Sequence, residues 1–180
     1  MDDVLTVEAP AVTPETTSVD EFHSLVADTH KFGGCAAEIH LPPPILKAHV
    51  AAHLVEEKNG VWTPTGRIVD LDSKWGLRVT FCMHGPLARV ICGDLDLTAS
   101  WDGYDLPEGR CSINDIRVDC NNLPCVTRVI NLTGKLTCPK DEGVYDFGIC
   151  AELTDVCRRE KTIVIGVCSL QGVKLNCKHS

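Results

Sequence analysis

The chain has 180 residues, of which 44% are hydrophobic and 23% charged, and its formal net charge is −8. This composition is typical of a globular protein that is long enough to form its own core. Seven acidic residues and no Lys or Arg lie in residues 1–30, so the rest of the chain is nearly neutral. A nearly neutral body with an acidic extension has no excess of positive charge to neutralise phosphates, which excludes nucleic acids and anionic membranes as partners. No apolar segment is long enough for insertion into a membrane as a helix.

Residues 1–34 differ from the rest and are predicted to be an acidic N-terminal extension, followed by a cysteine-rich domain over 35–180. Ser18 and Glu21 match a capping box, which predicts a short helix over about 19–28. The first residues lack the positive and apolar segments of a secretory signal, so the sequence leaves the export route open. A short strand ended by Pro10 is also expected, made of Val4, Leu5, Thr6, Val7, Glu8 and Ala9.

From residue 41 onward the sequence predicts about nine short strands separated by turns, with no helix of useful length. Asn59-Gly60 is a strong signal for a tight hairpin. Segments 77–84 and 95–101 alternate between apolar and polar residues, which is typical of strands with one buried face. A long loop is expected over 101–109. The expected strands cover residues 45–55, 61–69, 77–84, 87–92, 95–101, 112–118, 126–137, 144–153, 162–168 and 173–177.

Many short strands between turn signals indicate an all-β domain. We predict an antiparallel β-sandwich of immunoglobulin-like or jelly-roll-like type, stabilised by disulfides. The segment 142–148, which contains Tyr145, resembles the region around the tyrosine corner of immunoglobulin-like sandwiches. That resemblance implies a fold and no activity.

Eleven cysteines dominate the chemistry of the chain, and eight of them lie in its last 70 residues. Their spacings include no Cys-x-x-Cys pair, which argues against a structural zinc site and against a redox-active dithiol. The spacings suit disulfides that join strands across turns, and such bonds are favoured outside the cytosol. Disulfides are expected among Cys82, Cys92, Cys111, Cys120, Cys125, Cys138, Cys150, Cys157, Cys168 and Cys177.

The positions of the cysteines along the expected strands predict which way their side chains point. Cys138 and Cys177 share a face with apolar residues and are expected to point into the core, whereas Cys82 and Cys150 share a face with polar residues. An odd total leaves at least one thiol unpaired in an oxidised monomer. Cys82 and Cys150 are therefore candidates for disulfides between subunits; the alternative is one buried free cysteine that acts as a small hydrophobic residue.

No motif typical of catalysis, phosphate binding or dinucleotide binding is present, so we expect a protein that is not an enzyme and needs no cofactor or metal. The segment 101–109 contains Trp101, Tyr104 and Asp105, residue types that contact sugars or proteins in binding loops. It is the candidate ligand site if the protein is a monomeric secreted binding module.

These observations favour a structural or interaction subunit at an extracellular or surface location, whose partners are other copies of itself. Its strand 4–9 could add to an exposed sheet edge of the next copy, which would build rings or filaments. Two alternatives stay open, the secreted binding module and an intracellular metal-thiolate protein.

Overall fold

The computed structural model describes residues 31–41, 46–89, 91–118, 125–155 and 161–178. The predicted strand 4–9 and helix 19–28 lie outside these residues. No helix in the described part is long and apolar enough to cross a membrane. The elements are β1 (Cys35–Leu41), β2 (Leu46–Lys58), β3 (Val61–Pro64), β4 (Ile68–Asp70), β5 (Trp75–His84), the 3-10 helix η1 (Pro86–Arg89), β6 (Gly93–Gly103), β7 (Leu106–Val118), β8 (Cys125–Asn131), β9 (Gly143–Asp155) and β10 (Lys161–Asn176).

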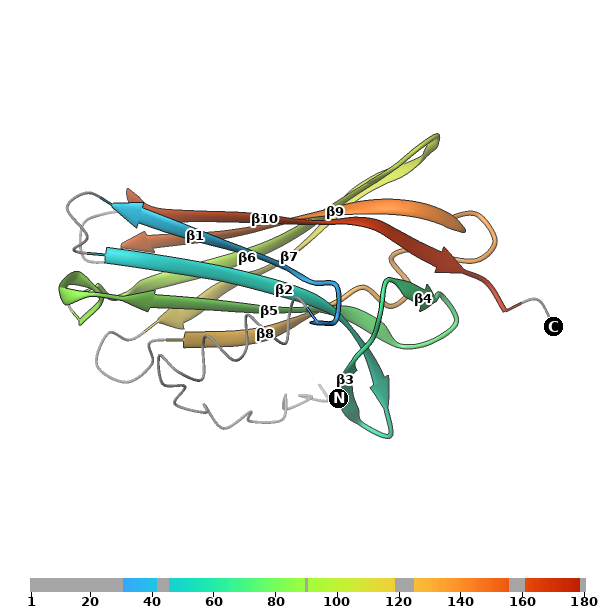
Figure 1. Cartoon of the computed structure of the whole chain (residues 1–180), viewed down its shortest axis with the longest axis horizontal. Helices are drawn as coiled ribbons and strands as arrows, with labels where there is room; N and C mark the ends of the chain where they lie inside the picture. Colours follow the sequence, from blue (N-terminus) through green and yellow to red (C-terminus); the bar gives the residue numbers. More distant parts are fainter. Residues whose placement is uncertain (1–30, 42–45, 90, 119–124, 156–160, 179–180) are drawn as a thin grey trace, which may run out of the picture.

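The strands form two sheets of five strands each (Figure 1). Sheet A has the order β1-β2-β5-β8, with β3 paired to β2, and sheet B has the order β4-β10-β9-β6-β7. All neighbours are antiparallel except β4 and β10, which run parallel over the last residues of β10. The chain enters sheet B briefly at β4 and returns to sheet A for β5. It then passes to sheet B for β6 and β7, returns to sheet A for β8, and ends in sheet B.

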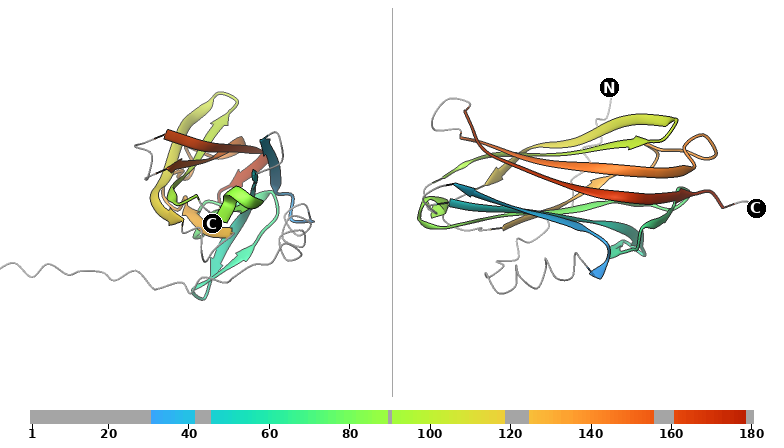
Figure 2. Two further views of the ribbon diagram at one scale, coloured as in Figure 1. Left: turned by 90° about the vertical axis from the view of Figure 1, so that its left-hand side faces the viewer. Right: turned by 45° about the horizontal axis from the view of Figure 1, so that its top comes forward.

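The two sheets lie as two layers, and sheet B is curled into a half-barrel (Figure 2). Inward side chains from both sheets belong to one hydrophobic core. Phe147 of β9 lies near its centre, with its ring centroid 6.1 Å from Trp75 of β5 and 6.4 Å from both Trp101 and Tyr145. Because β5 and β9 belong to different sheets, this aromatic cluster joins the two layers.

Alternating residues correctly predict the inward faces of β5 and β6. Leu77 and Val79 of β5, and Leu95 and Leu97 of β6, are all 0% exposed. The Asn59-Gly60 hairpin is also confirmed: both residues have positive φ, and Lys58 pairs with Val61 across the turn.

Two predictions about the first half of the chain are wrong. The expected strand 61–69 is divided into β3 and β4, which belong to different sheets. The hydrogen bonding to β2 ends where the amide of Thr65 donates to the carbonyl of Leu54 at 3.0 Å, and the chain bends before β4. The expected strand 87–92 is replaced at its start by η1, in which the amide of Ala88 donates to the carbonyl of Gly85 at 3.1 Å. The strand β1 was not anticipated.

Two further boundaries differ in the second half. The expected strand 126–137 stops as β8 at Asn131, whose side-chain oxygen accepts from the amide of Thr133 at 2.9 Å and turns the chain. The expected strands 162–168 and 173–177 are one strand, β10, with a register shift between Leu170 and Val173. Asp146 supports this bulge, since its carboxylate accepts from the amide of Gly172 at 2.8 Å.

Tyr145 does not form a tyrosine corner. Its side chain is 0% exposed, and its hydroxyl has no hydrogen-bond partner among the residues that the structure describes. A tyrosine corner would instead donate this hydroxyl to the backbone. Burial, followed by the nearby Asp141 carboxylate, raises the pKa of Tyr145 above its ordinary value because both disfavour the phenolate.

We predict that Tyr145→Phe either keeps the free energy of unfolding at pH 7 within about 1 kcal/mol of the wild-type value or increases it. The reason is that a buried hydroxyl without a hydrogen-bond partner contributes little to stability. In the folded state, the Tyr145 hydroxyl keeps its proton at pH values above about 10, which is the pKa of tyrosine in the unfolded chain. The wild-type protein should therefore lose stability as pH rises through this value, and the variant should lose less. Urea unfolding at pH 8 and pH 10.5, with free thiols blocked, measures the difference. Equal losses of stability in the wild type and the variant between the two pH values would contradict the raised pKa of Tyr145.

Candidate functional site

The described part of the chain contains two disulfides, and the first lies within sheet A. Cys82 of β5 and Cys125 of β8 are directly opposite each other in the ladder and are bonded through their sulfur atoms. Cys82 is 0% exposed and Cys125 is 6% exposed. Cys82 is therefore unavailable for a bond to another subunit, contrary to the prediction from its strand phase.

Burial of both faces of β5 explains this error. The predicted polar face of β5 carries Thr80, which is 5% exposed, and the neighbouring β2 carries His53, which is 8% exposed. Alternation in a sequence identifies the more apolar face of a strand, but it does not show whether the other face is also covered.

The second disulfide joins Cys138, in the turns between β8 and β9, to Cys177, directly after β10. Both side chains are half-buried and pack against the core. This bond fastens the connection between the two sheets to the last strand of sheet B.

The remaining predicted cysteines occupy several different environments. Cys92 precedes β6 and is half-buried, and Cys111 of β7 packs against the edge of the core. Cys168 of β10 is buried beside Cys35, a residue that was absent from the predicted disulfide set. Cys120 and Cys157 lie outside the described residues.

Cys150 carries a free thiol in a half-buried position on the outer face of sheet B. It pairs with Thr98 of β6 and with Val167 of β10 in the ladders. Val167 and its neighbour on the same face, Ile165, are 58% and 54% exposed. Burial, followed by the charge of Glu152, raises the pKa of the Cys150 thiol, so it is protonated at neutral pH.

The segment 101–109 is not a long loop but a hairpin of two strands. Gly103 of β6 pairs with Leu106 of β7, so Tyr104 and Asp105 alone form the turn. Pro107 is tolerated because β7 is the edge strand of sheet B. This segment was predicted to be a loop because Gly, Asp and Pro residues are common in loops, and its strands were therefore not recognised.

The three ligand-loop candidates are not brought together. Trp101 is 7% exposed, and its ring lies against the backbone of Gly109, where an added Cβ would be 2.5 Å from the Cζ2 atom of the ring. Tyr104 is 91% exposed, and Asp105 has a φ of 54° in the turn. The hairpin tip projects away from the body of the protein (Figure 1).

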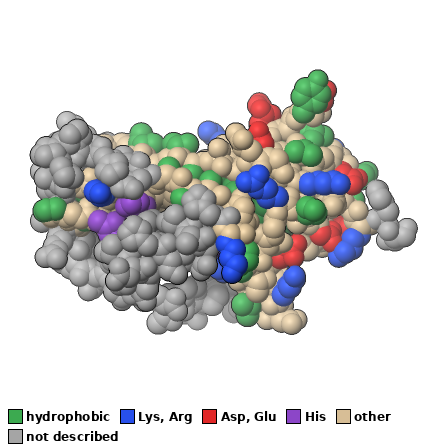
Figure 3. Space-filling view, viewed as in Figure 1, with side chains coloured by type: hydrophobic (Ala, Val, Ile, Leu, Met, Phe, Trp, Pro, Cys, Tyr) green, Lys and Arg blue, Asp and Glu red, His purple; other side chains and the backbone are tan. Residues whose placement is uncertain are grey.

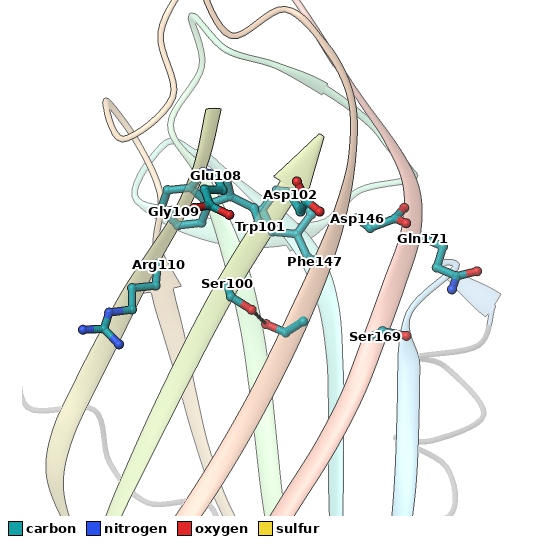
Figure 4. A pocket seen from close by; sticks show the side chains of 11 residues that line it. Ser100, Trp101, Asp102, Glu108, Gly109, Arg110, Asp146, Phe147, Ser169 and Gln171 are labelled. Carbon is teal, nitrogen blue, oxygen red and sulfur yellow. Dashed lines mark hydrogen bonds between the residues drawn. The ribbon is translucent and has the colours of Figure 1, made fainter. Parts of the chain in front are cut away.

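A groove of about 590 Å³ lies on the outer face of sheet B, at the base of this hairpin. Its floor is a row of small residues across three neighbouring strands, Ser100 of β6, Gly148 of β9 and Ser169 of β10. The Ser100 hydroxyl donates to the Gly148 carbonyl at 3.3 Å. Figure 4 shows Asp102, Asp146 and Gln171 at one end of the groove. The sequence gives no signal for it, since its residues come from four strands.

The lining of this groove carries more negative than positive charge. Its lining residues include three carboxylates, Asp102, Glu108 and Asp146, and one cation, Arg110. The wider surface is mixed, with acidic and basic side chains interspersed on the described part of the face shown in Figure 3. Within the described ranges, no group of three or more His, Cys, Asp or Glu residues is placed to hold a metal ion.

Comparison with known proteins does not identify a relative. No protein-family model, no curated protein and no solved structure matches this chain. The functional argument therefore depends on the geometry of the chain itself.

We predict that replacing both Cys82 and Cys125 by Ala lowers the free energy of unfolding by about 2–4 kcal/mol, because the bond restricts the unfolded chain over 43 residues. Denaturant unfolding under non-reducing conditions measures this loss. Cys150→Ala is the matched control and should change stability by less than about 0.5 kcal/mol. Equal midpoints for the double variant and the wild type would show that the bond does not stabilise the fold.

Proposed function

We propose that this chain is a non-enzymatic structural or interaction subunit that assembles with copies of itself at an extracellular or surface location. The observation that carries the proposal is the outer edge of β7. Within the described residues, β7 pairs with β6 only, and it presents an unpaired edge along 13 residues. Such an edge is a template for another strand.

We infer that sheets A and B form a β-sandwich of immunoglobulin-like or jelly-roll-like type. The shared core and the repeated passage of the chain between the sheets support this inference.

β7 is the favoured acceptor because the other edges are shorter or covered. The edge strands β1 and β8 of sheet A have seven residues each. The last residues of β10 pair with β4, and Cys168 in its middle lies against β1. β7 therefore offers the longest open ladder to an incoming strand.

The proposed donor is the N-terminal segment of another copy, residues 4–9. This segment is apolar at alternate positions and precedes the domain, so it could reach a neighbouring molecule. A contact between the extension of one copy and β7 of the next uses two different surfaces. Head-to-tail contacts of this kind build rings or filaments rather than closed dimers.

Disulfides support the proposed location and the durability of the assembly. Bonds such as Cys82–Cys125 and Cys138–Cys177 are typical of proteins in oxidising compartments. Cys150 lies on the outer face of sheet B beside two exposed apolar side chains, so a second copy that covers this face would meet its thiol. Cys150 is the cysteine that we assign to bonds between subunits.

A monomeric binding module is the second candidate, and the groove on sheet B favours it. Its volume of about 590 Å³ is within the usual range for small-molecule sites. Hydroxyl and carboxylate groups such as those of Ser100, Asp102 and Ser169 suit a sugar, and the exposed Tyr104 suits a protein ligand. The metal-thiolate alternative has no comparable support among the described residues.

We predict that Val7→Pro reduces the mass of the native particle to that of a monomer, because proline removes a backbone donor from the inserted strand. Light scattering coupled to size-exclusion chromatography measures the mass. Ala11→Pro, outside the predicted strand, is the matched control and should leave the assembly intact. Deletion of residues 1–34 should act like Val7→Pro. Assemblies that persist in both variants would show that the extension is not the connector.

We also predict that Cys150→Ser abolishes a dimer band on non-reducing gels of the native protein, whereas Cys111→Ser leaves it in place. The band arises because Cys150 is accessible from outside, while Cys111 faces the core. A dimer band of equal intensity in both variants would assign the bond to another cysteine.

A further inference from the structure

Two cysteines outside the assigned disulfides lie close together at the edge of the two sheets. Cys35 is the first residue of β1 in sheet A, and Cys168 lies in the middle of β10 in sheet B. Their sulfur atoms are 2.6 Å apart, and the residues are 9% and 7% exposed. Unbonded heavy atoms usually pack at about 3.5–4.0 Å. The separation is therefore closer to that of a bonded pair than to a contact between two thiols.

Sheet pairing, rather than a loop, places these two residues. Cys35 pairs with Ala52 of β2, and Cys168 pairs with Ile149 of β9. Ala52 and Ile149 are both 0% exposed, so each cysteine is held by a ladder that is part of the core. The packing of the two sheets around their shared core then brings the two sulfur atoms together.

We propose that Cys35 and Cys168 form a third disulfide bond, which joins β1 of sheet A directly to β10 of sheet B. Of the three bonds, Cys82–Cys125 lies within one sheet, and Cys138–Cys177 joins segments that flank strands. The new bond connects residues 133 positions apart, against 43 and 39 for the other two. It closes the side of the molecule opposite β7.

The bond forms by exchange with a low-molecular-weight disulfide such as oxidised glutathione. The Cys35 thiolate attacks one sulfur of the oxidant and releases one glutathione thiol. The Cys168 thiol then loses its proton and attacks the Cys35 sulfur, which releases the second glutathione. Two electrons and two protons pass from the cysteines to the oxidant, which becomes two thiols.

The electrostatics of the pair suit this order of events. The hydrogen bond between the two sulfur atoms lowers the pKa of Cys35, although burial opposes the effect. The same hydrogen bond, followed by burial, raises the pKa of Cys168. Cys35 is therefore the attacking thiolate, and Cys168 holds the proton until the second step.

This bond has a consequence for the N-terminal extension that rests on the proposed function. The extension is continuous with β1, which begins at Cys35. Tension on an extension inserted into a neighbouring copy would reach β1 first, a strand of seven residues at the sheet edge. A bond at the first residue of β1 transfers that tension to β10 and prevents β1 from peeling away. The bond itself does not require self-association.

Peptide mapping of the unmodified full chain tests the bond. The protein is folded with reduced and oxidised glutathione, its free thiols are alkylated, and it is digested with trypsin without reductant. Cleavage at Lys and Arg places Cys35 alone in peptide 32–47 and Cys168 alone in peptide 162–174. We expect these two peptides to be linked and to separate on reduction. Recovery of both as alkylated single peptides, or linkage of either one to another cysteine, would overturn the proposal.

Substitutions provide a second readout. Cys35→Ala and Cys168→Ala should each leave one additional alkylated thiol, on the former partner, and lower the melting temperature by about 5–10 °C. The double variant should melt no lower than the single variants, because all three lack the same bond. Cys111→Ala is the control and should retain the linked peptides. Additive losses in the double variant would show two independently packed thiols and contradict the proposal; if the variants fail to fold, the wild-type map still decides.

Discussion

The hydrophobic core shared by the two sheets is the constraint on which the rest of the structure depends. Phe147 of sheet B contacts Trp75 of sheet A and the rings of Trp101 and Tyr145 beside it. Neither sheet could bury its inner face alone, so the sheets fold together. Closing this core determines which strands become edges, and the edges determine where a partner strand can add.

Covalent bonds act on the same constraint. Cys82–Cys125 fixes the last strand of sheet A to its centre, and Cys138–Cys177 fastens the end of β10. The proposed bond from Cys35 would close the side where β1 meets β10. The hairpin of β6 and β7 has no such bond within the described residues, and it carries both the open edge and part of the lining of the groove. In the proposed assembly, the side where β1 meets β10 is therefore held by a covalent bond, and the side formed by β7 accepts the incoming strand.

Alternation was sufficient to predict the all-β class and the inner faces of β5 and β6, because burial of one face leaves a direct pattern in the residues. It failed at Cys82, since the second face of β5 is also buried, which depends on what covers the sheet. It failed at Pro107 because a strand at an edge tolerates a residue that usually ends one. Cys35 was missed as a partner because its neighbour, Cys168, is 133 residues away and is brought to it only by the two ladders. The groove likewise combines four strands, and no local segment could predict it.

The central claim is that a covalently fastened two-sheet body leaves one open edge, through which copies join. The mass of the native full-length protein, measured by native mass spectrometry before and after reduction, tests this claim most directly. We expect oxidised particles whose masses are multiples of the 19.6 kDa chain. Strand insertion should hold part of these particles together after mild reduction. A single species of 19.6 kDa under both conditions, at concentrations where the protein is fully folded, would contradict it.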